Sequence, residues 1–256
     1  MGDVTIHCMV RNEPFVYYAV KSVYPLAHTI LLYDTGSCDK HTIADIRQLM
    51  VEDREDKIVF ERVPIEFDQT PWTTRPKDSN FHAKMSARNE GKRGAAYCRQ
   101  KMIDDTQTPF FMIVDGDEVH YKSNHEPIRR AVIEWPKGKL CGVLPLVWFK
   151  HLNQTFWNTS SGRIFKTDEV CIKGIYPSEM HTGKKGQKLR HPSVSFNVPR
   201  AIPYAHFESY LKPWRRDIHT EDLVPFDGPL PEVMMENDEY IRRLEGEDPI
   251  DRSLHG

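Results

Sequence analysis

Hydrophobic and polar positions divide the first half of the chain into alternating strand and helix patterns. Short apolar or β-branched runs bounded by polar turns predict strands, and apolar residues at three- and four-residue spacing predict helices. The predicted strands are Val4–Val10, Thr29–Tyr33, Lys57–Val63 and Phe110–Val114, and the predicted helices are Phe15–Tyr24, Thr42–Val51 and Gly94–Asp104. This alternation predicts an α/β fold with a mostly parallel, Rossmann-like central sheet flanked by helices. Asn12, followed by Pro14, is expected to cap the first helix.

The second half of the chain has a less regular pattern. Its predicted elements are a long strand at Leu140–Lys150, a short hairpin formed by Arg163–Lys166 and Val170–Lys173, a last strand at Ala201–His206 and a terminal helix at Leu230–Leu244. The lysine-rich segment 183–190 shows no periodicity, which predicts a loop. We therefore expect one domain whose regular first half is followed by a less regular second half.

Composition and charge narrow the class of protein. The net charge of -2 argues against a globally basic nucleic-acid-binding protein, although it leaves room for a local basic patch. No run of 18 apolar residues is present, and the first residues lack the pattern of a signal peptide, so we expect no membrane span. Five cysteines without a CxxC pair argue against a disulfide framework or structural zinc, and they favour a cytoplasmic protein.

Two aspartates follow the predicted strand Phe110–Val114, at the edge where parallel sheets bind ligands. Asp115 and Asp117 flank Gly116, so alternation places both carboxylates on one side of an extended chain, and the glycine permits close approach of the backbone. Carboxylate oxygens are the ligands that Mg²⁺ and Mn²⁺ prefer, and a diphosphate would supply the others. The triplet therefore predicts a metal that neutralises a departing diphosphate; taken alone, it also fits a solvent-exposed strand end.

In this context the sequence resembles the family-2-type nucleotide-sugar glycosyltransferases of the GT-A fold, in which an apolar strand ends in Asp-x-Asp. Those enzymes carry an Arg-Asn pair about sixteen residues upstream, and a glycine five residues before that arginine. Here Arg99 lies 16 residues before the first aspartate and five after Gly94, with Gln100 in place of the asparagine. Ala87-Arg88-Asn89 offers the right residue types at the wrong spacing, so we favour Arg99.

Two earlier segments resemble the same family. Val4–Val10 followed by Arg11-Asn12-Glu13 is similar to its first strand and Asn-Glu signature, and Asp34–Thr42 is similar to its Asp-x-Gly-Ser-x-Asp-x-x-Thr turn. The resemblance implies that Asp34 binds the nucleotide base. A carboxylate can accept the imide N–H of uracil, which favours a uridine donor; taken alone, Asp34 also fits an Asx turn or helix cap. The residues assigned in this way to the nucleotide sugar are Val10, Arg11, Glu13, Asp34, Arg99, Asp115 and Gly116.

An inverting sugar transfer needs a base that takes the proton of the acceptor hydroxyl. The acidic candidates in the second half are Asp168, Glu169, Glu179, Glu208, Glu221 and Asp222. In a subgroup of the family, a strand reading Arg-Leu-Phe-Arg is followed by a glycine and a His-Glu pair. Arg163–Lys166 and Glu179 are similar, with Ser178 in place of the histidine, and the resemblance implies Glu179 as the base. It also implies that His206, after the next strand, joins Asp117 and Asp115 as a metal ligand.

These observations predict a metal-dependent glycosyltransferase, a hexosyl- or pentosyltransferase. It would use Mn²⁺ or Mg²⁺ and a nucleotide sugar, with a UDP-sugar favoured, and it would transfer the sugar to an acceptor hydroxyl with inversion. Residues 1–119 would form the nucleotide-sugar-binding half, residues 120–225 the acceptor and catalytic half, and residues 226–256 a terminal helix and tail.

Other functions remain open. The same chemistry could act on a hydroxylated base of DNA, because cations such as Lys184 and Arg215 are interleaved with Trp157 and Trp214 along the sequence. A metal-dependent phosphohydrolase or nuclease could use the aspartate pair together with Glu118, and a binding module without catalysis would need no base. A nicotinamide-dependent dehydrogenase is disfavoured, because no GxGxxG loop follows the first predicted strand.

Overall fold

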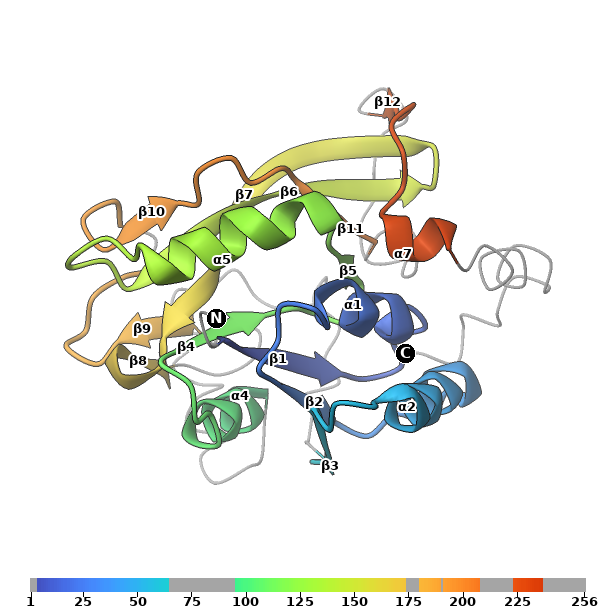
Figure 1. The fold of residues 1–256 in the computed structure, drawn as a ribbon, viewed down its shortest axis with the longest axis horizontal. Helices are drawn as coiled ribbons and strands as arrows, with labels where there is room; N and C mark the ends of the chain where they lie inside the picture. Colours follow the sequence, from blue (N-terminus) through green and yellow to red (C-terminus); the bar gives the residue numbers. More distant parts are fainter. Residues whose placement is uncertain (1–3, 65–94, 174–179, 190, 208–222, 237–256) are drawn as a thin grey trace, which may run out of the picture.

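A ten-stranded sheet organises the protein in a computed structural model, which describes residues 4–64, 95–173, 180–189, 191–207 and 223–236 (Figure 1). The strand order is β3-β2-β1-β4-β7-β6-β11-β5, with β10 beside β6 and β12 beside β7. The strands on the β3 side are parallel, and antiparallel pairing begins where β4 meets β7. The expected α/β class with a mostly parallel sheet is confirmed.

The parallel half follows the predicted order of strands and helices closely. Its strands are β1 (Val4–Val10), β2 (Thr29–Asp34), β3 (Ile58–Arg62) and β4 (Phe110–Ile113). Its helices are α1 (Val16–Val23), α2 (Lys40–Glu52) and α4 (Ala95–Asp104). Strand β1 lies between β2 and β4, and all three run in the same direction, so their carboxyl ends meet at one edge of the sheet.

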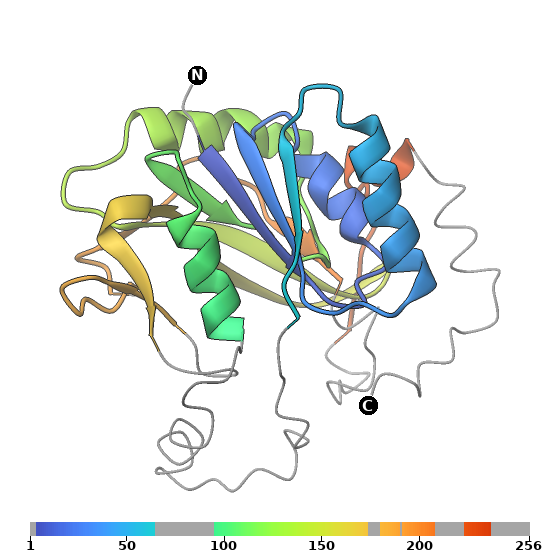
Figure 2. The same ribbon diagram turned by 90° about the horizontal axis from the view of Figure 1, so that it is seen from below.

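Alternation along β1 explains why helices cover both faces of this half. Val4, Ile6, Cys8 and Val10 are buried in a core shared with residues of α1, α2 and α5 (His125–Ile133). On the opposite face, Met9 packs against a second cluster that includes Cys98 and Met102 of α4. The two views place α4 across the sheet from α1 and α5 (Figures 1 and 2). A strand buried on both faces requires the near-continuous apolar sequence that β1 has.

The second half is dominated by a long antiparallel pair, β6 (Cys141–His151) and β7 (Gln154–Lys166). Strand β7 also pairs antiparallel with β4, and this pairing joins the two halves. The remaining strands of the sheet are β5 (Glu118–Val119), β10 (Ser195–Asn197), β11 (Tyr204–His206) and β12 (Val224–Pro225). Among the described residues, α7 (Glu232–Met235) is the part of the predicted terminal helix that is seen, and none of the described helices is long and apolar enough to cross a bilayer.

The predicted hairpin of Arg163–Lys166 with Val170–Lys173 is wrong. Arg163–Lys166 is the end of β7, whereas β8 (Val170–Lys173) pairs with β9 (Met180–Gly183) in a separate two-stranded sheet. The polar run Asn158-Thr159-Ser160-Ser161 and Gly162 interrupt the apolar pattern of β7. Pairing with β6 carries the strand through that run, and no local pattern reveals such pairing.

Candidate functional site

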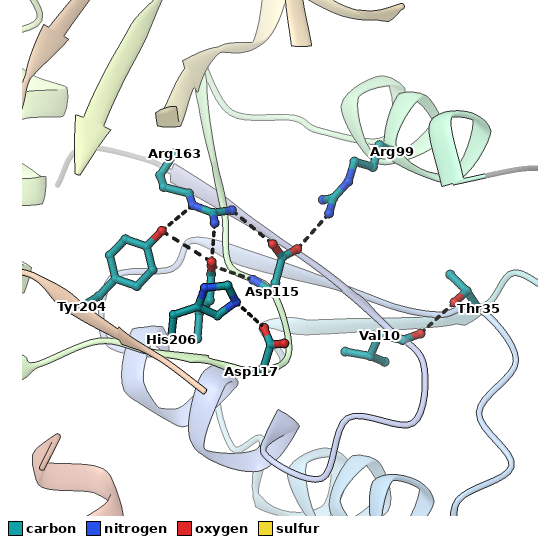
Figure 3. A network of polar contacts seen from close by, with 9 residues as sticks. Val10, Thr35, Arg99, Asp115, Asp117, Arg163, Tyr204 and His206 are labelled. Carbon is teal, nitrogen blue, oxygen red and sulfur yellow. Dashed lines mark hydrogen bonds and ion pairs between the residues drawn. The ribbon is translucent and has the colours of Figure 1, made fainter. Parts of the chain in front are cut away.

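The motif segments meet at the carboxyl ends of β1, β2 and β4. Val10 lies opposite Asp34 in the register of β1 and β2. Gly116, just beyond β4, packs so closely on the end of β1 that an added Cβ would lie 2.8 Å from the Glu13 Cβ and 3.1 Å from the Val10 Cγ1. Figure 3 shows Thr35 joined to Val10 by a hydrogen bond, with Val10 on the side of Asp117. The structure therefore brings together three segments whose sequences resemble family motifs.

Asp34 closes the turn that follows β2. Its side chain is buried, and Oδ1 accepts hydrogen bonds from the backbone N–H groups of Gly36 at 3.1 Å and Ser37 at 2.7 Å. Thr35 ties the same turn to β1, because its N–H and hydroxyl both donate to the Val10 carbonyl, at 2.9 and 3.0 Å. Asp34 thus forms the Asx turn that its residue type favours, and its contact with a nucleotide base stays a prediction.

Arg62, the last residue of β3, lies beside this turn and was not singled out from the sequence. Its Nε lies 3.5 Å from Asp34 Oδ2, and its NH2 donates to the Ser37 carbonyl at 3.1 Å. The Arg62 side chain is largely exposed. The available signal was its position at a strand end, the same criterion that identified Asp34.

Asn12 stabilises the Asp34 turn and does not cap α1. Its φ is 53°, and its Oδ1 accepts from the N–H groups of Cys38 at 2.9 Å and Asp39 at 3.0 Å. Phe15 occupies the N-cap position of α1 without a side-chain hydrogen bond. The expected Asn12 cap is therefore wrong, because long-range backbone donors near residue 38 use the amide oxygen instead. Asp39 is the residue that caps a helix, α2, by accepting from the Thr42 N–H at 2.7 Å.

Asp115 lies between two arginines that approach it from different elements (Figure 3). Arg99 of α4 donates through NH2 to Oδ1 at 2.8 Å, and Arg163 of β7 donates through NH1 to Oδ2 at 3.2 Å. Burial alone would raise the pKa of Asp115, but the two guanidinium groups lower this pKa to about 2. Arg99 therefore lies beside the aspartate pair, and its contact with the nucleotide sugar stays a prediction. A metal bound directly to Asp115 would compete with both arginines.

Glu118 and Tyr204 complete the surroundings of Arg163. Its NH2 forms an ion pair with Glu118 Oε1, and its Nε donates to the Tyr204 hydroxyl at 2.7 Å. Glu118 is fully buried, and burial raises its pKa to about 7 although the Arg163 charge lowers it. Neither Arg163 nor Tyr204 was predicted from the sequence to be a site residue. The available signal for Arg163 was the similarity of Arg163–Lys166 to the Arg-Leu-Phe-Arg strand of the family.

Asp117 and His206 form the second half of the site. Asp117 Oδ1 lies 3.3 Å from His206 Nε2, both residues are buried, and the Trp148 ring lies 3.9 Å from the His206 ring. Neighbouring ligands of an octahedral Mg²⁺ or Mn²⁺ ion lie about 3 Å apart, given metal–oxygen distances of about 2.1 Å. The pair therefore fits two adjacent positions of such an ion. Among the described residues there is no cluster of three or more His, Cys, Asp or Glu side chains that could hold a metal.

Gln100, which stands where the family has asparagine, has a structural role. Its Oε1 accepts from the Ile172 N–H at 2.9 Å, and its Nε2 donates to Asp104 Oδ1 at 2.7 Å. The first contact anchors β8 to α4, and the second lies within α4. On β9, opposite Ile172 of β8, burial and the charges of Arg99 and Arg163 lower the pKa of His181 to about 3.

Several base candidates can be placed relative to the site. Asp168 and Glu169 lie in a turn next to the amino end of β4, because the Thr167 N–H donates to the Pro109 carbonyl at 3.0 Å. This is the edge of the sheet opposite to Asp115. Lys184 lies at that edge too, since its N–H donates to the Glu169 carbonyl at 2.8 Å, so it lies away from Asp117. The other candidates, Glu179, Glu208, Glu221 and Asp222, lie outside the described residues.

Comparisons with known proteins give similarity in fold but not in sequence. No protein-family model matches the sequence, and no curated protein matches it. S. aureus TarS residues 1–349, in complex with UDP-GlcNAc, is similar at a TM-score of 0.47 and 10% identity, over 98% of this chain and 69% of that chain. Glucosyl-3-phosphoglycerate synthase from Mycobacterium tuberculosis, in complex with Mn²⁺, UDP and phosphoglyceric acid, is similar at a TM-score of 0.33 and 12% sequence identity. This match covers 57% of this chain and 43% of that chain. The chain thus spans less than half of the latter protein, and similarity at this level carries no functional inference.

Proposed function

We propose that the protein is a metal-dependent glycosyltransferase that transfers a sugar from a UDP-sugar to an acceptor hydroxyl. The observation that supports this proposal most is the convergence of three motif segments at one sheet edge. There Asp34 ends β2, Gly116 packs on Glu13 after β1, and Asp117 lies beside His206. A nucleoside diphosphate has a base, a ribose and a diphosphate. We assign the base to Asp34, the ribose to the end of β1 and Asp115, and the diphosphate to a metal held by Asp117 and His206.

Each residue has a defined task in this proposal. Asp34 accepts the imide N–H of uracil, and the end of β1, from Val10 to Glu13, contacts base or ribose. Asp117 and His206 hold Mn²⁺ or Mg²⁺, which when bound neutralises the negative charge of the leaving diphosphate. Asp115, oriented by Arg99, faces the ribose. Glu179 is the proposed base for an inverting transfer.

The geometry disfavours the phosphohydrolase or nuclease alternative. That function needs Glu118 as a third metal-binding acid. Glu118 is instead fully buried, accepts a hydrogen bond from the Asp115 N–H at 3.1 Å and pairs with Arg163. A carboxylate engaged in this way would have to lose a buried ion pair before it could bind a metal, which is costly.

A screen of nucleotide sugars tests the proposal directly. Thermal stability and donor hydrolysis would be measured with UDP- and GDP-sugars, each with and without Mn²⁺. We expect a UDP-sugar plus Mn²⁺ to raise the melting temperature more than either component alone. The absence of any metal-dependent stabilisation by any nucleotide sugar would contradict the proposal, and release of free phosphate without sugar transfer would favour the phosphohydrolase.

A further inference from the structure

Arg163 uses three nitrogens on three different partners. NH1 donates to Asp115, NH2 to Glu118 and Nε to the Tyr204 hydroxyl. The Arg163 side chain is only 11% exposed. A buried arginine with a fully used planar fork fixes the relative positions of its partners more strictly than a lysine could, because the fork geometry is rigid.

The turn that carries the aspartate pair is itself closed twice. The Glu118 N–H donates to the Asp115 carbonyl at 3.0 Å, and the Asp115 N–H donates to Glu118 Oε2 at 3.1 Å. Glu118 therefore joins the two ends of the turn, and Arg163 joins Glu118 to the Asp115 carboxylate. Without the Arg163 guanidinium group, the backbone hydrogen bond between Glu118 and Asp115 would remain, but the Asp115 carboxylate would no longer be held in one orientation.

Asp115 is the member of this group that can reach a ligand. Its side chain is 31% exposed, compared with 14% for Arg99 and 11% for Arg163. The two arginines occupy opposite oxygens of the carboxylate, which fixes its plane. A partly exposed carboxylate held in one plane by buried cations is suited to accept hydrogen bonds from a pair of neighbouring hydroxyls.

Stability alone does not account for the group. Buried ion pairs often contribute little net stability compared with apolar residues of similar volume, because desolvation offsets the attraction between the charges. We propose that Arg163, supported by Tyr204, is a positioning residue that orients Asp115 toward the ribose hydroxyls of the donor. The proposal rests on the proposed function, and it assigns a donor-recognition role to residues of the second half of the chain.

The test compares UDP with 2′,3′-dideoxy-UDP, which lacks both ribose hydroxyls. Dissociation constants would be measured by calorimetry in the presence of Mn²⁺ for the wild type, Arg163→Lys, Tyr204→Phe and Lys166→Gln. Hydrogen bonds to a charged acceptor predict that the wild type prefers UDP by on the order of tenfold or more. Arg163→Lys should reduce this preference to about threefold or less by weakening UDP binding, with the affinity for the dideoxy nucleotide unchanged. Tyr204→Phe should reduce it less.

Lys166→Gln is the matched control, because Lys166 lies on the same strand but forms a partly exposed pair with Glu169. It should keep the preference of the wild type. A folded Arg163→Lys or Tyr204→Phe variant with an unchanged preference would overturn the proposal, as would equal binding of both nucleotides by the wild type. If Arg163→Lys does not fold, Tyr204→Phe decides, because it removes a single hydroxyl. A wild type that binds neither nucleotide with Mn²⁺ would instead refute the proposed function.

Discussion

The parallel and antiparallel halves of the sheet contribute residues to the same site from different positions along their strands. In the parallel half the site residues follow strand ends, as Glu13 follows β1 and Asp115 follows β4. In the antiparallel half Arg163 lies inside β7, one position beyond the Met112–Ile164 pair. Because β7 runs against β4, the carboxyl end of β4 meets the interior of β7. In a parallel sheet the site residues therefore lie at the carboxyl ends of the strands, which the sequence pattern locates. In an antiparallel strand they can lie at any point along the strand.

The largest effect that would test this comparison is expected at Asp117. Asp117→Ala removes a carboxylate at a strand-end position that contacts His206 of the antiparallel half. We expect metal-dependent UDP binding to fall below detection, because a divalent cation at this site would lose its anionic protein ligand. Calorimetric titration with Mn²⁺ and UDP would measure this loss. Asp168→Ala, at the opposite edge, is the control and should bind as the wild type does; unchanged binding by Asp117→Ala would remove the metal role from this residue.

The same contrast explains what the sequence could predict. The strands and helices of the parallel half were predicted to within a few residues, because apolar period and polar turn residues are local signals. Arg163 and Tyr204 were not recognised as site residues, because their role depends on how β7 and β11 pair with distant strands. Asn12 was assigned to the wrong partner for a similar reason: its hydrogen bonds reach residues 38 and 39 rather than its own helix.

The close packing of Gly116 offers a second test, with a smaller expected effect. In Gly116→Ala the new Cβ would lie 2.8 Å from the Glu13 Cβ, an atom fixed to the backbone, so the turn must move away from β1. Overpacking of this kind costs about 1–3 kcal/mol, and we expect much of it to appear as weaker UDP binding. Gly138→Ala is the control: it meets no atom within 4 Å but has a φ of +77°, so it should lower stability without changing UDP binding. Equal UDP affinities in both variants would contradict the predicted contact between Gly116 and the nucleotide.

Acidic pH should destabilise both halves through buried neutral histidines. Burial lowers the pKa of His7 on β1 well below its ordinary value, and it lowers the pKa of His120, which follows β5, to about 3. Below about pH 6.5 these histidines are protonated in the unfolded chain but stay neutral in the folded protein. Each of them therefore lowers the free energy of unfolding by up to about 1.4 kcal/mol per pH unit. Glu118, with a pKa raised to about 7, acts in the opposite direction below pH 7. Burial also lowers the pKa of His181 on β9 to about 3, which adds a third cost of the same kind. We expect a net loss of roughly 3–4 kcal/mol between pH 7.5 and 5, measured by urea unfolding; greater stability at pH 5 would contradict this balance.

The smallest predicted effect is a gain in stability in the antiparallel half. His120 is buried, its ring stacks on Tyr204 at 4.6 Å, and neither ring nitrogen has a hydrogen-bond partner among the described residues. His120→Phe keeps the stacked ring and removes two buried polar atoms, so we expect the free energy of unfolding to rise by about 1 kcal/mol and its pH dependence to weaken. His125→Phe is the matched control with the opposite sign, because His125 Nε2 contacts the Ser22 carbonyl oxygen at 2.8 Å. A loss of stability in His120→Phe similar to that of the control would mean that a bound water or another partner satisfies the His120 ring.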